Sequence, residues 1–456
     1  MKKIIYLIAG AILISSCAVK YQQPKVDADH LVRGAECTDT TFDVHQLDWR
    51  EFYQDPYLVA LIDSALIHNF DMKVALARIE QAASYFKQGK AAFFPSLNAN
   101  VSGGITQPDL KSSSTQYYSL GANLSWEIDI WGKISSAKRG KYEALLAQQN
   151  TRNAIQTKLI SSIATAYYSL VVLDTEKRFI IETIQNREEY LATVKELKNA
   201  AQVTEVAVLQ AEAQLLLAKT YLPDIEHAIF RTESTLSLLL GVPPMEIPRG
   251  SVNSLEDIHF PIMEEIGVPA KLLRNRPDVL AAEHSLKGAL EGFNSAKAAM
   301  YPSLTLTGNI SSDATYISNW FAMPGSLIYG LIGGLTQPIF NSRALRTQKE
   351  VAYQEYQIAA IEFQECVLNA GAEVSNTLSS LRSDREKVGY MTKQTIALGK
   401  AYDYSVELLI NGYANYLDVL SAQEGFFNAK INLIMGLQEC INDHIELYRA
   451  LGGGWN

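Results

Sequence analysis

Four stretches of the chain are predicted to be β-strands, and the first three alternate between apolar and polar side chains with a period of two residues. They run from Ser96 to Ile105, from Tyr118 to Asp129, from Ser303 to Ser311 and from Leu327 to Thr336. In the first stretch Leu97 and Val101 share one face, while Asn98 and Asn100 lie on the other. The last stretch is apolar on both faces and rich in glycine. The pattern predicts two β-hairpins, at about 96–129 and 303–336.

Two much longer stretches have a helical pattern. No proline occurs between Pro108 and Pro223 or after Pro338, and a proline in a helix interior costs roughly 3 kcal/mol. We therefore predict continuous helices from Ile134 to about Ala200 and from Arg343 to about Asn411, each on the order of 100 Å long.

Apolar or small residues recur along both helices in steps of four and three, as in a coiled-coil seam. The first series is Ile155, Leu159, Ser162, Ala166 and Leu173; the second is Val367, Gly371, Val374, Leu378, Leu381 and Val388. Lys177 and Arg187 interrupt the first series. The small residues predict that neighbouring backbones approach closely along each seam.

Shorter helices are expected on both sides of these elements. Each long helix is followed by a turn and a returning helix, from about Thr204 to Leu240 and from Leu417 to about Leu451. A shorter helix precedes each hairpin, at about Leu58 to Ala92 and Ala270 to Ala299. Both halves of the chain thus have the order helix, β-hairpin, very long helix, turn, helix.

The sequence itself repeats with the same spacing. The segment Lys90 to Leu97 recurs as Lys297 to Leu304, with the shared pattern Lys-Ala-Ala, two large residues and Pro-Ser-Leu. Such self-similarity indicates a duplicated structural unit. We predict a signal peptide over 1–16, an extended lipid-anchored segment over 17–56, repeat 1 over 57–240, a proline-rich linker over 241–269 and repeat 2 over 270–456.

Strands of about ten residues are long enough to cross a bilayer when tilted. Aromatic residues flank the predicted strands, as in the interfacial girdles of transmembrane barrels. Phe93, Phe94, Trp131, Tyr301 and Phe340 are expected at one end of the strands, and Tyr117, Tyr316, Trp320 and Phe321 near the other. The alternative is a water-soluble sheet with one buried face, because alternation alone does not distinguish lipid from a protein core.

Four strands cannot close a membrane barrel by themselves. An open sheet edge in hydrocarbon leaves unpaired backbone groups, each costing several kcal/mol. We therefore expect copies of the chain to share one barrel, with eight strands from two copies or twelve from three.

The N-terminus has the features of a secretory signal. Met1-Lys2-Lys3 is basic, an apolar stretch runs from Ile4 to Leu13, and small residues precede Cys17. This stretch is too short for a spanning helix. It resembles the lipobox of bacterial lipoproteins, which implies that Cys17 becomes the lipid-modified N-terminus. Ala18 follows, where Asp often retains lipoproteins in the inner membrane, and this favours the outer membrane.

Composition narrows the remaining chemistry. A net charge of −9 over 456 residues argues against a nucleic-acid surface. The other cysteines are Cys37, Cys366 and Cys440, without metal-binding spacing, and the last two are expected to be small core residues. Ser84-x-x-Lys87 and Ser135-x-x-Lys138 match an acyl-enzyme pattern only by chance. We predict no catalytic site, no metal site and no cofactor.

Four segments together resemble the TolC-like outer-membrane efflux factors, in the lipoprotein branch of that family. They are Trp49 to Pro56, Ser125 to Lys133, Leu272 to Val279 with Ala281-Ala282-Glu283, and Leu447 to Trp455. The resemblance covers nearly the whole chain. It implies a mainly α-helical homotrimer with a twelve-stranded transmembrane β-barrel, continued by a long α-helical barrel. It also implies a tripartite efflux system in which a periplasmic adaptor and an inner-membrane pump are the partners.

The resemblance further implies that the turns between the long helices carry adaptor contacts and a gate. The matching residues are Val203, Thr204 and Glu205 in repeat 1, and Gly412, Ala414, Asn415, Tyr416, Leu417 and Asp418 in repeat 2. The family often has an acid where this chain has Ser421, and Ala201 lies opposite Gly412.

Two of these positions have alternative roles. Three copies of Asp418 around an axis would form a carboxylate ring, or each would cap its own helix. Leu417 would form a constriction or pack within the turn. For the whole protein, the main hypothesis is a passive export channel. The alternatives are a non-conducting outer-membrane scaffold and an envelope hydrolase.

Overall fold

The computed structural model describes residues 18–24, 31–33, 47–107, 113–250, 254–261 and 275–455. The predicted signal peptide, Cys17 and Cys37 lie outside these residues. The chain forms two compact units, and each draws on both halves of the sequence. The sheet unit comprises the described residues of Met1–Lys25, Ala77–Asn150 and Leu280–Glu365. The hairpin unit comprises those of Val26–Leu76, Thr151–Val279 and Cys366–Asn456.

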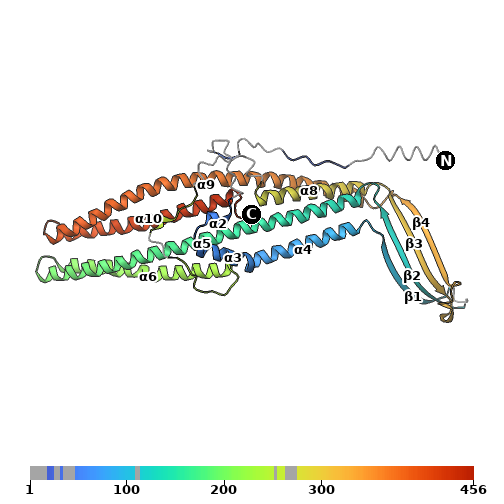
Figure 1. The fold of residues 1–456 in the computed structure, drawn as a ribbon, viewed down its shortest axis with the longest axis horizontal. Coiled ribbons are helices and arrows are strands. Elements are labelled where there is room, and N and C mark those ends of the chain that lie inside the picture. Colours follow the sequence, from blue (N-terminus) through green and yellow to red (C-terminus); the bar gives the residue numbers. More distant parts are fainter. Residues whose placement is uncertain are drawn as a thin grey trace. The chain divides into compact units, whose positions relative to one another are not determined.

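The described elements confirm a mainly helical chain with a small β part (Figure 1). Repeat 1 contains α3 (Pro56–His68), α4 (Phe70–Ala91), β1 (Ser96–Thr106), β2 (Thr115–Ile128), α5 (Lys133–Asn199) and α6 (Glu205–Leu239). Repeat 2 contains α8 (Pro277–Ala298), β3 (Ser303–Ala314), β4 (Leu327–Thr336), α9 (Ala344–Ile410) and α10 (Tyr416–Ala450). Short helices α2 (Trp49–Phe52), η2 (Leu255–Asp257) and η3 (Ile317–Asn319) complete the order.

Most predicted boundaries agree with the structure to within a few residues. The predicted helix from Leu58 to Ala92 is instead broken at Asn69 into α3 and α4. The Asn69 side-chain oxygen accepts a hydrogen bond from Met72 N–H (3.1 Å), and its amide donates to the carbonyl of Leu239 (2.8 Å). This capping satisfies backbone groups that an uninterrupted helix would have paired internally. Helix α6 continues through Pro223.

The sheet is antiparallel with the order β1-β2-β3-β4, so both hairpins join side by side through β2 and β3 (Figure 1). The register pairs Asn98 with Asn123 and Asn123 with Asn309, which places polar residues in a row across three strands. Strands β1 and β4 are the two edges of this sheet.

The apolar strand residues do not form a protein core in the isolated chain. Leu97, Val101 and Ile105 of β1 are each about two-thirds exposed, and Leu331 and Leu335 of β4 equally so. A water-soluble sheet would bury one such face. The exposure therefore argues against the soluble-sheet alternative. Among the described residues, no helix has both the length and the apolar character needed to span a bilayer.

Two helices that carry the strands pack closely within the sheet unit. Arg139 of α5 makes a bidentate ion pair with Glu291 of α8, at 2.7 and 2.9 Å. A Cβ atom on Gly140 would lie 3.5 Å from the carbonyl oxygen of Gly288, so the two backbones are close. Asn294 of α8 brackets the backbone of Val19, donating to its carbonyl and accepting from its N–H.

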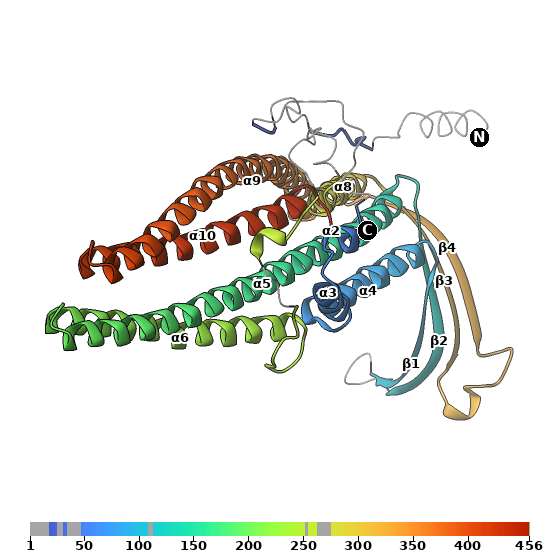
Figure 2. The same ribbon diagram turned by 60° about the vertical axis from the view of Figure 1, so that its left-hand side comes forward.

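In the hairpin unit, the helix pairs α5–α6 and α9–α10 each form an antiparallel hairpin (Figure 2). Of the two predicted seams, the α9 series is confirmed by burial from Val367 to Leu381, whereas its last member, Val388, is only partly buried. The α5 series is only partly correct. Leu159 is buried, but Ser162 and Ala166 line a groove. The α5 core is formed instead by residues displaced by about one position, including Ile160, Ile163, Ala164, Tyr167 and Val171.

An acidic pair lies between α9 and α10. The Asp443 carboxyl faces Asp384, and its Oδ2 atom has no hydrogen-bond donor among the described residues. Burial, followed by the charge of Asp384, raises the pKa of Asp443 to about 7. Lys387 donates to Glu439 at 2.7 Å and lies 3.8 Å from Asp384. Two facing carboxyls form a hydrogen bond only when one of them holds a proton.

The predicted core role of the two helical cysteines was wrong, since Cys366 and Cys440 are only partly buried. Cys440 lies beside the acidic pair. Burial and the charges of Asp384 and Asp443 raise the pKa of its thiol to about 11, which keeps the thiol protonated and unreactive at neutral pH.

We predict that the acidic pair makes thermal stability depend on pH. Between the ordinary carboxyl pKa and about 7, the folded protein holds a proton on Asp443 that the unfolded chain releases. Stability therefore falls as the pH rises through this range. Asp443→Asn should flatten the pH profile of the melting temperature between pH 5 and 8. Asp403→Asn, at an exposed position of α9, is the control. An Asp443→Asn profile as steep as wild type would contradict the assignment.

Candidate functional site

The predicted tip residues lie in two turns of the hairpin unit, one joining α5 to α6 and one joining α9 to α10 (Figure 2). Both turns end the long helix in the same way. Ala201 and Gly412 take the left-handed conformation, with φ of 59° and 75°. In each turn the next residue donates back across the turn, Gln202 to the carbonyl of Leu197 and Tyr413 to that of Leu408. This hydrogen bond is the Schellman motif.

A capping box begins α10. The Asn415 side chain accepts hydrogen bonds from the N–H groups of Leu417 (2.8 Å) and Asp418 (3.1 Å). The Asp418 carboxylate accepts in return from the N–H of Asn415 (3.0 Å). Four backbone N–H groups at a helix start have no partner within the helix, and this box satisfies three such donors at the turn. Asp418 therefore has the capping role in each chain, whatever it does in an assembly.

The start of α6 is built differently. Thr204 occupies the N-cap position but makes no side-chain capping bond. Glu205 forms an ion pair with Lys198 of α5 across the turn, and its charge lies in the first turn of α6, where the helix dipole favours an acid. Both ion-pair side chains are about half exposed, so the pair adds little stability.

One hydrophobic cluster, which we call the tip core, joins both turns. Its buried members are Tyr190, Leu191, Val194, Ala207, Val208, Ala211, Leu215, Leu409 and Val419, from all four helices. Two of the predicted site residues, Val203 and Tyr416, are partly buried against it. The two tips are thus a single packed body rather than independent loops.

Other tip residues face solvent. Tyr413 is 83% exposed and Leu417 is 49% exposed. Leu417 is therefore about half covered within its own chain, and the other half of its side chain is accessible to a neighbouring molecule. Exposed apolar side chains gathered at one tip are typical of a surface that another protein covers.

The predicted aromatic residues gather at the two ends of the sheet. At one end the rings of Trp131 and Tyr301 stack with centroids 5.2 Å apart, and the indole N–H of Trp131 donates to Pro302. Phe94 and Phe340 at this end are exposed. At the other end Trp320 contacts Tyr118 and Phe321. Tyr117 and Tyr316 are exposed there. At the first end, the indole N–H of Trp126 donates to the backbone carbonyl of Phe93 at 2.9 Å.

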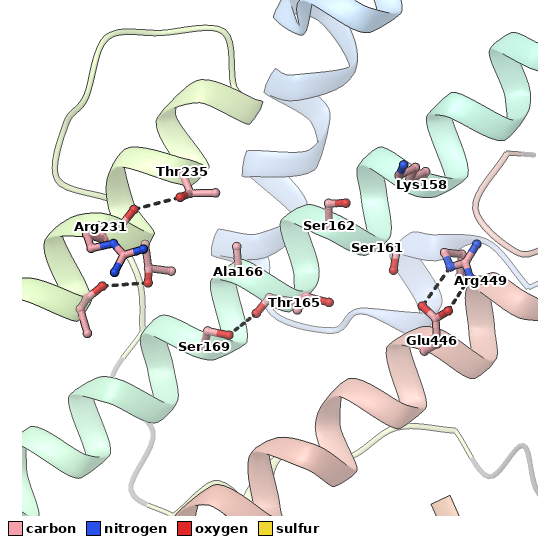
Figure 3. A pocket seen from close by; sticks show the side chains of 12 residues that line it. Lys158, Ser161, Ser162, Thr165, Ala166, Ser169, Arg231, Thr235, Glu446 and Arg449 are labelled. Atoms are coloured by element: carbon pink, nitrogen blue, oxygen red, sulfur yellow. Dashed lines mark hydrogen bonds and ion pairs between the residues drawn. The ribbon is translucent and has the colours of Figure 1, made fainter. Parts of the chain in front are cut away.

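A polar groove of about 870 Å³ runs along α5, α6 and α10 in the hairpin unit (Figure 3). It is lined by Lys158, Ser161, Ser162, Thr165, Ala166, Ser169, Ala228, Arg231, Thr232, Thr235, Glu446 and Arg449. Several hydroxyls, including those of Ser169 and Thr232, donate to carbonyls of their own helices. None of these lining residues is a histidine, so no serine in the groove has an imidazole base beside it.

In the described part of the chain, no group of three or more His, Cys, Asp and Glu side chains is arranged to hold a metal ion. The side-chain arrangement favours packing, capping and interface roles.

Sequence reasoning missed the role of one buried charge. Lys177 and Arg187 both interrupt the predicted α5 seam, yet they differ in the structure. Lys177 is paired with Glu226 near the surface, whereas Arg187 is 2% exposed. The one sequence feature that could have indicated a buried charge was a charged residue at a seam position. Sequence alone did not say which of the two is buried.

Comparison with known proteins identifies the family. Residues 61–242 and 268–453, most of the chain, match the family model described as outer membrane efflux protein. The chain belongs to the outer membrane efflux protein family.

Individual relatives agree with this membership. The efflux protein is 28% identical to the probable outer membrane lipoprotein SilC of Salmonella typhimurium, over 99% of this chain and 97% of SilC. It is 27% identical to the solvent efflux pump outer membrane protein SrpC of Pseudomonas putida, over 89% and 87%. Its fold matches the open state of the MtrE outer membrane channel of Neisseria gonorrhoeae, with a TM-score of 0.87, 24% identity and 97% and 99% coverage. The predicted resemblance is confirmed, and the protein is an outer-membrane efflux protein.

We predict opposite effects of two substitutions at the matched turns of this efflux protein. Ala201→Gly should stabilise the protein by about 0.5–1 kcal/mol, because a left-handed Ala is strained and Gly is not. Gly412→Ala should destabilise it by about 1 kcal/mol. A Cβ atom at Gly412 would contact nothing within 4 Å, so any loss comes from the backbone alone. Thermal unfolding followed by helical circular dichroism measures both, and shifts of the same sign would contradict the turn assignment.

Proposed function

We propose that three copies of the chain form a twelve-stranded β-barrel across the outer membrane, continued by a helical barrel of the α5–α6 and α9–α10 hairpins. The observation that carries this proposal is the sheet, which has two open edges and exposes the apolar residues of its edge strands. In hydrocarbon, unpaired edges are excluded unless another chain pairs with them. Three sheets of four strands close such a barrel and leave room for a lumen.

The groove along α5 supports the same assembly. Its Ser162 and Ala166 belong to the predicted coiled-coil seam, yet none of the described elements fills it. A neighbouring copy supplying a long helix would complete the seam, because small side chains allow close approach of two helices.

The membrane position follows from two anchors. The strand-end aromatics Phe93, Phe94, Trp131, Tyr301 and Phe340 would lie at one lipid interface, and Tyr117, Tyr316 and Trp320 at the other. Cys17 would carry a lipid that adds a second anchor. Each buried methylene of an acyl chain stabilises membrane binding by about 0.8 kcal/mol. The relative SilC is itself described as an outer membrane lipoprotein.

We infer that the tips bind a periplasmic adaptor, which links the channel to an inner-membrane pump. The relative SrpC is the outer membrane protein of a solvent efflux pump. Supporting this role, the tip carries exposed Tyr413 and Leu417 above a core shared by both hairpins. The chain offers no catalytic constellation in its described residues that would supply energy, so transport would be passive and specificity would lie mainly in the pump.

A non-conducting scaffold is the second candidate, and conductance separates the two. Purified protein in planar bilayers should show discrete channels, with low open probability when the tip is intact. Cross-linking in mild detergent should give a trimer. A stable monomer, or bilayers that remain silent even with tip variants, would favour the scaffold.

We predict that two substitutions at Asp418 separate a carboxylate ring from a helix cap. Asp418→Asn removes the charge but keeps an oxygen that can accept from the Asn415 N–H. Asp418→Ala removes both and should lower stability by about 1 kcal/mol. If a carboxylate ring gates the tip, both variants raise basal conductance and weaken its cation dependence. An effect of Asp418→Ala alone would mean that only the cap matters.

A further inference from the structure

The four helices of the hairpin unit contain two hydrophobic clusters near the tip rather than one continuous seam. The first is the tip core. The second, which we call the middle core, is built on Ile180, Ile225 and Phe427, with Phe179, Leu222, Ile229 and Ile431 packed around it. Only Ile184 is described in contact with both. Helices α5, α6 and α10 contribute residues to both cores, whereas α9 contributes only to the tip core.

Polar residues of α5, α9 and α10 lie at the boundary between the cores, and we call them the polar layer. They are Arg187 and Tyr190 of α5, Tyr402 of α9 and Gln423 of α10. Tyr190 itself lies at the edge of the tip core, and Tyr402 packs against it. Gln423 is 5% exposed and donates to the Tyr402 hydroxyl at 3.4 Å.

Arg187 is the centre of the polar layer. Its guanidinium lies 5.1 Å from the centre of the Phe427 ring and donates to the carbonyl of Gln214. Its Nε atom is buried and has no hydrogen-bond partner among the described residues, and no acid there pairs with it. Burial lowers the pKa of Arg187, while Tyr221, Tyr402 and Glu424 act in the opposite direction. The charge is thus desolvated without an ionic partner.

A neighbouring group also lacks a partner. The Tyr190 hydroxyl is buried without a hydrogen bond among the described residues. A buried polar group without a partner destabilises the folded arrangement, and water can satisfy it once the helices separate. Hydration of these groups would therefore offset part of the free energy that is lost with the apolar contacts when the hairpins part at this layer.

We propose that the polar layer is a release plane, at which the tip core moves as a unit relative to the middle core. This inference rests on the proposed opening of the tip during efflux and names the place in the chain where the movement occurs. A partially satisfied polar layer in a helical seam keeps register at a cost in stability. Here that cost makes separation of the two cores easy, while each core stays intact.

Hydrogen–deuterium exchange of the full-length protein in detergent tests the release plane directly. In wild type, amides of the tip core should exchange together and faster than those of the middle core. Arg187→Met joins the cores with an apolar side chain, and Tyr190→Phe deletes one unpartnered hydroxyl. Both should slow exchange of tip-core amides about tenfold. Lys195→Met, at an exposed position of the same helix, is the control and should change nothing.

Tyr190→Phe decides the outcome if Arg187→Met fails to fold, because loss of one hydroxyl keeps the ring packing. Exchange at the tip that is unchanged or faster in Tyr190→Phe overturns the release plane. Tip and middle amides that exchange at the same rate in wild type would overturn it as well.

Conductance in planar bilayers distinguishes failure of this inference from failure of the channel proposal. Arg187→Met should lower the open probability relative to wild type and Lys195→Met. If wild type does not conduct but exchange changes as expected, the channel proposal fails and the release plane stands. If exchange is unaffected, the release plane fails whether or not the protein conducts.

Discussion

Backbone hydrogen bonding at the edges of one small sheet constrains the whole molecule. Strands β1 and β4 each have one side without a strand partner in the described part of the chain, and the apolar residues of these strands are exposed. In water such a sheet would be an aggregation site, and in lipid it would leave unpaired N–H and C=O groups. Both problems disappear when copies of the chain pair edge to edge. The long helices that leave these strands then have to follow the same arrangement.

Much of the fold could be predicted from the sequence because it depends on periodicity and on the absence of proline. Helices α5 and α9 each span 67 residues, within one residue of the predicted ends. The pairing of the strands was harder to predict from the sequence. The order β1-β2-β3-β4 depends on contacts between repeats that lie about 200 residues apart, and alternation within one strand does not reveal its neighbour.

The candidate site was predicted less completely, for reasons that particular residues make clear. Gly412 indicated a left-handed turn by its residue type, but Ala201 takes the same conformation without being a glycine. Spacing did not reveal that Asp418 and Asn415 cap each other. Seam positions on α5 were displaced by about one residue, because small residues fit both a core and an interface. The burial of Arg187 required the packing of four helices, which no local pattern encodes.

The two hairpins also match in length to the residue. Helices α5 and α9 have 67 residues each, and α6 and α10 have 35 each. Deleting one residue from a helix turns everything beyond it by about 100° and shortens it by about 1.5 Å. A deletion in one hairpin would therefore misalign its turn with the other. We expect an insertion or deletion in one hairpin to be tolerated only together with a matching change in the other. The helix lengths of the two halves would then stay equal even where their sequences differ.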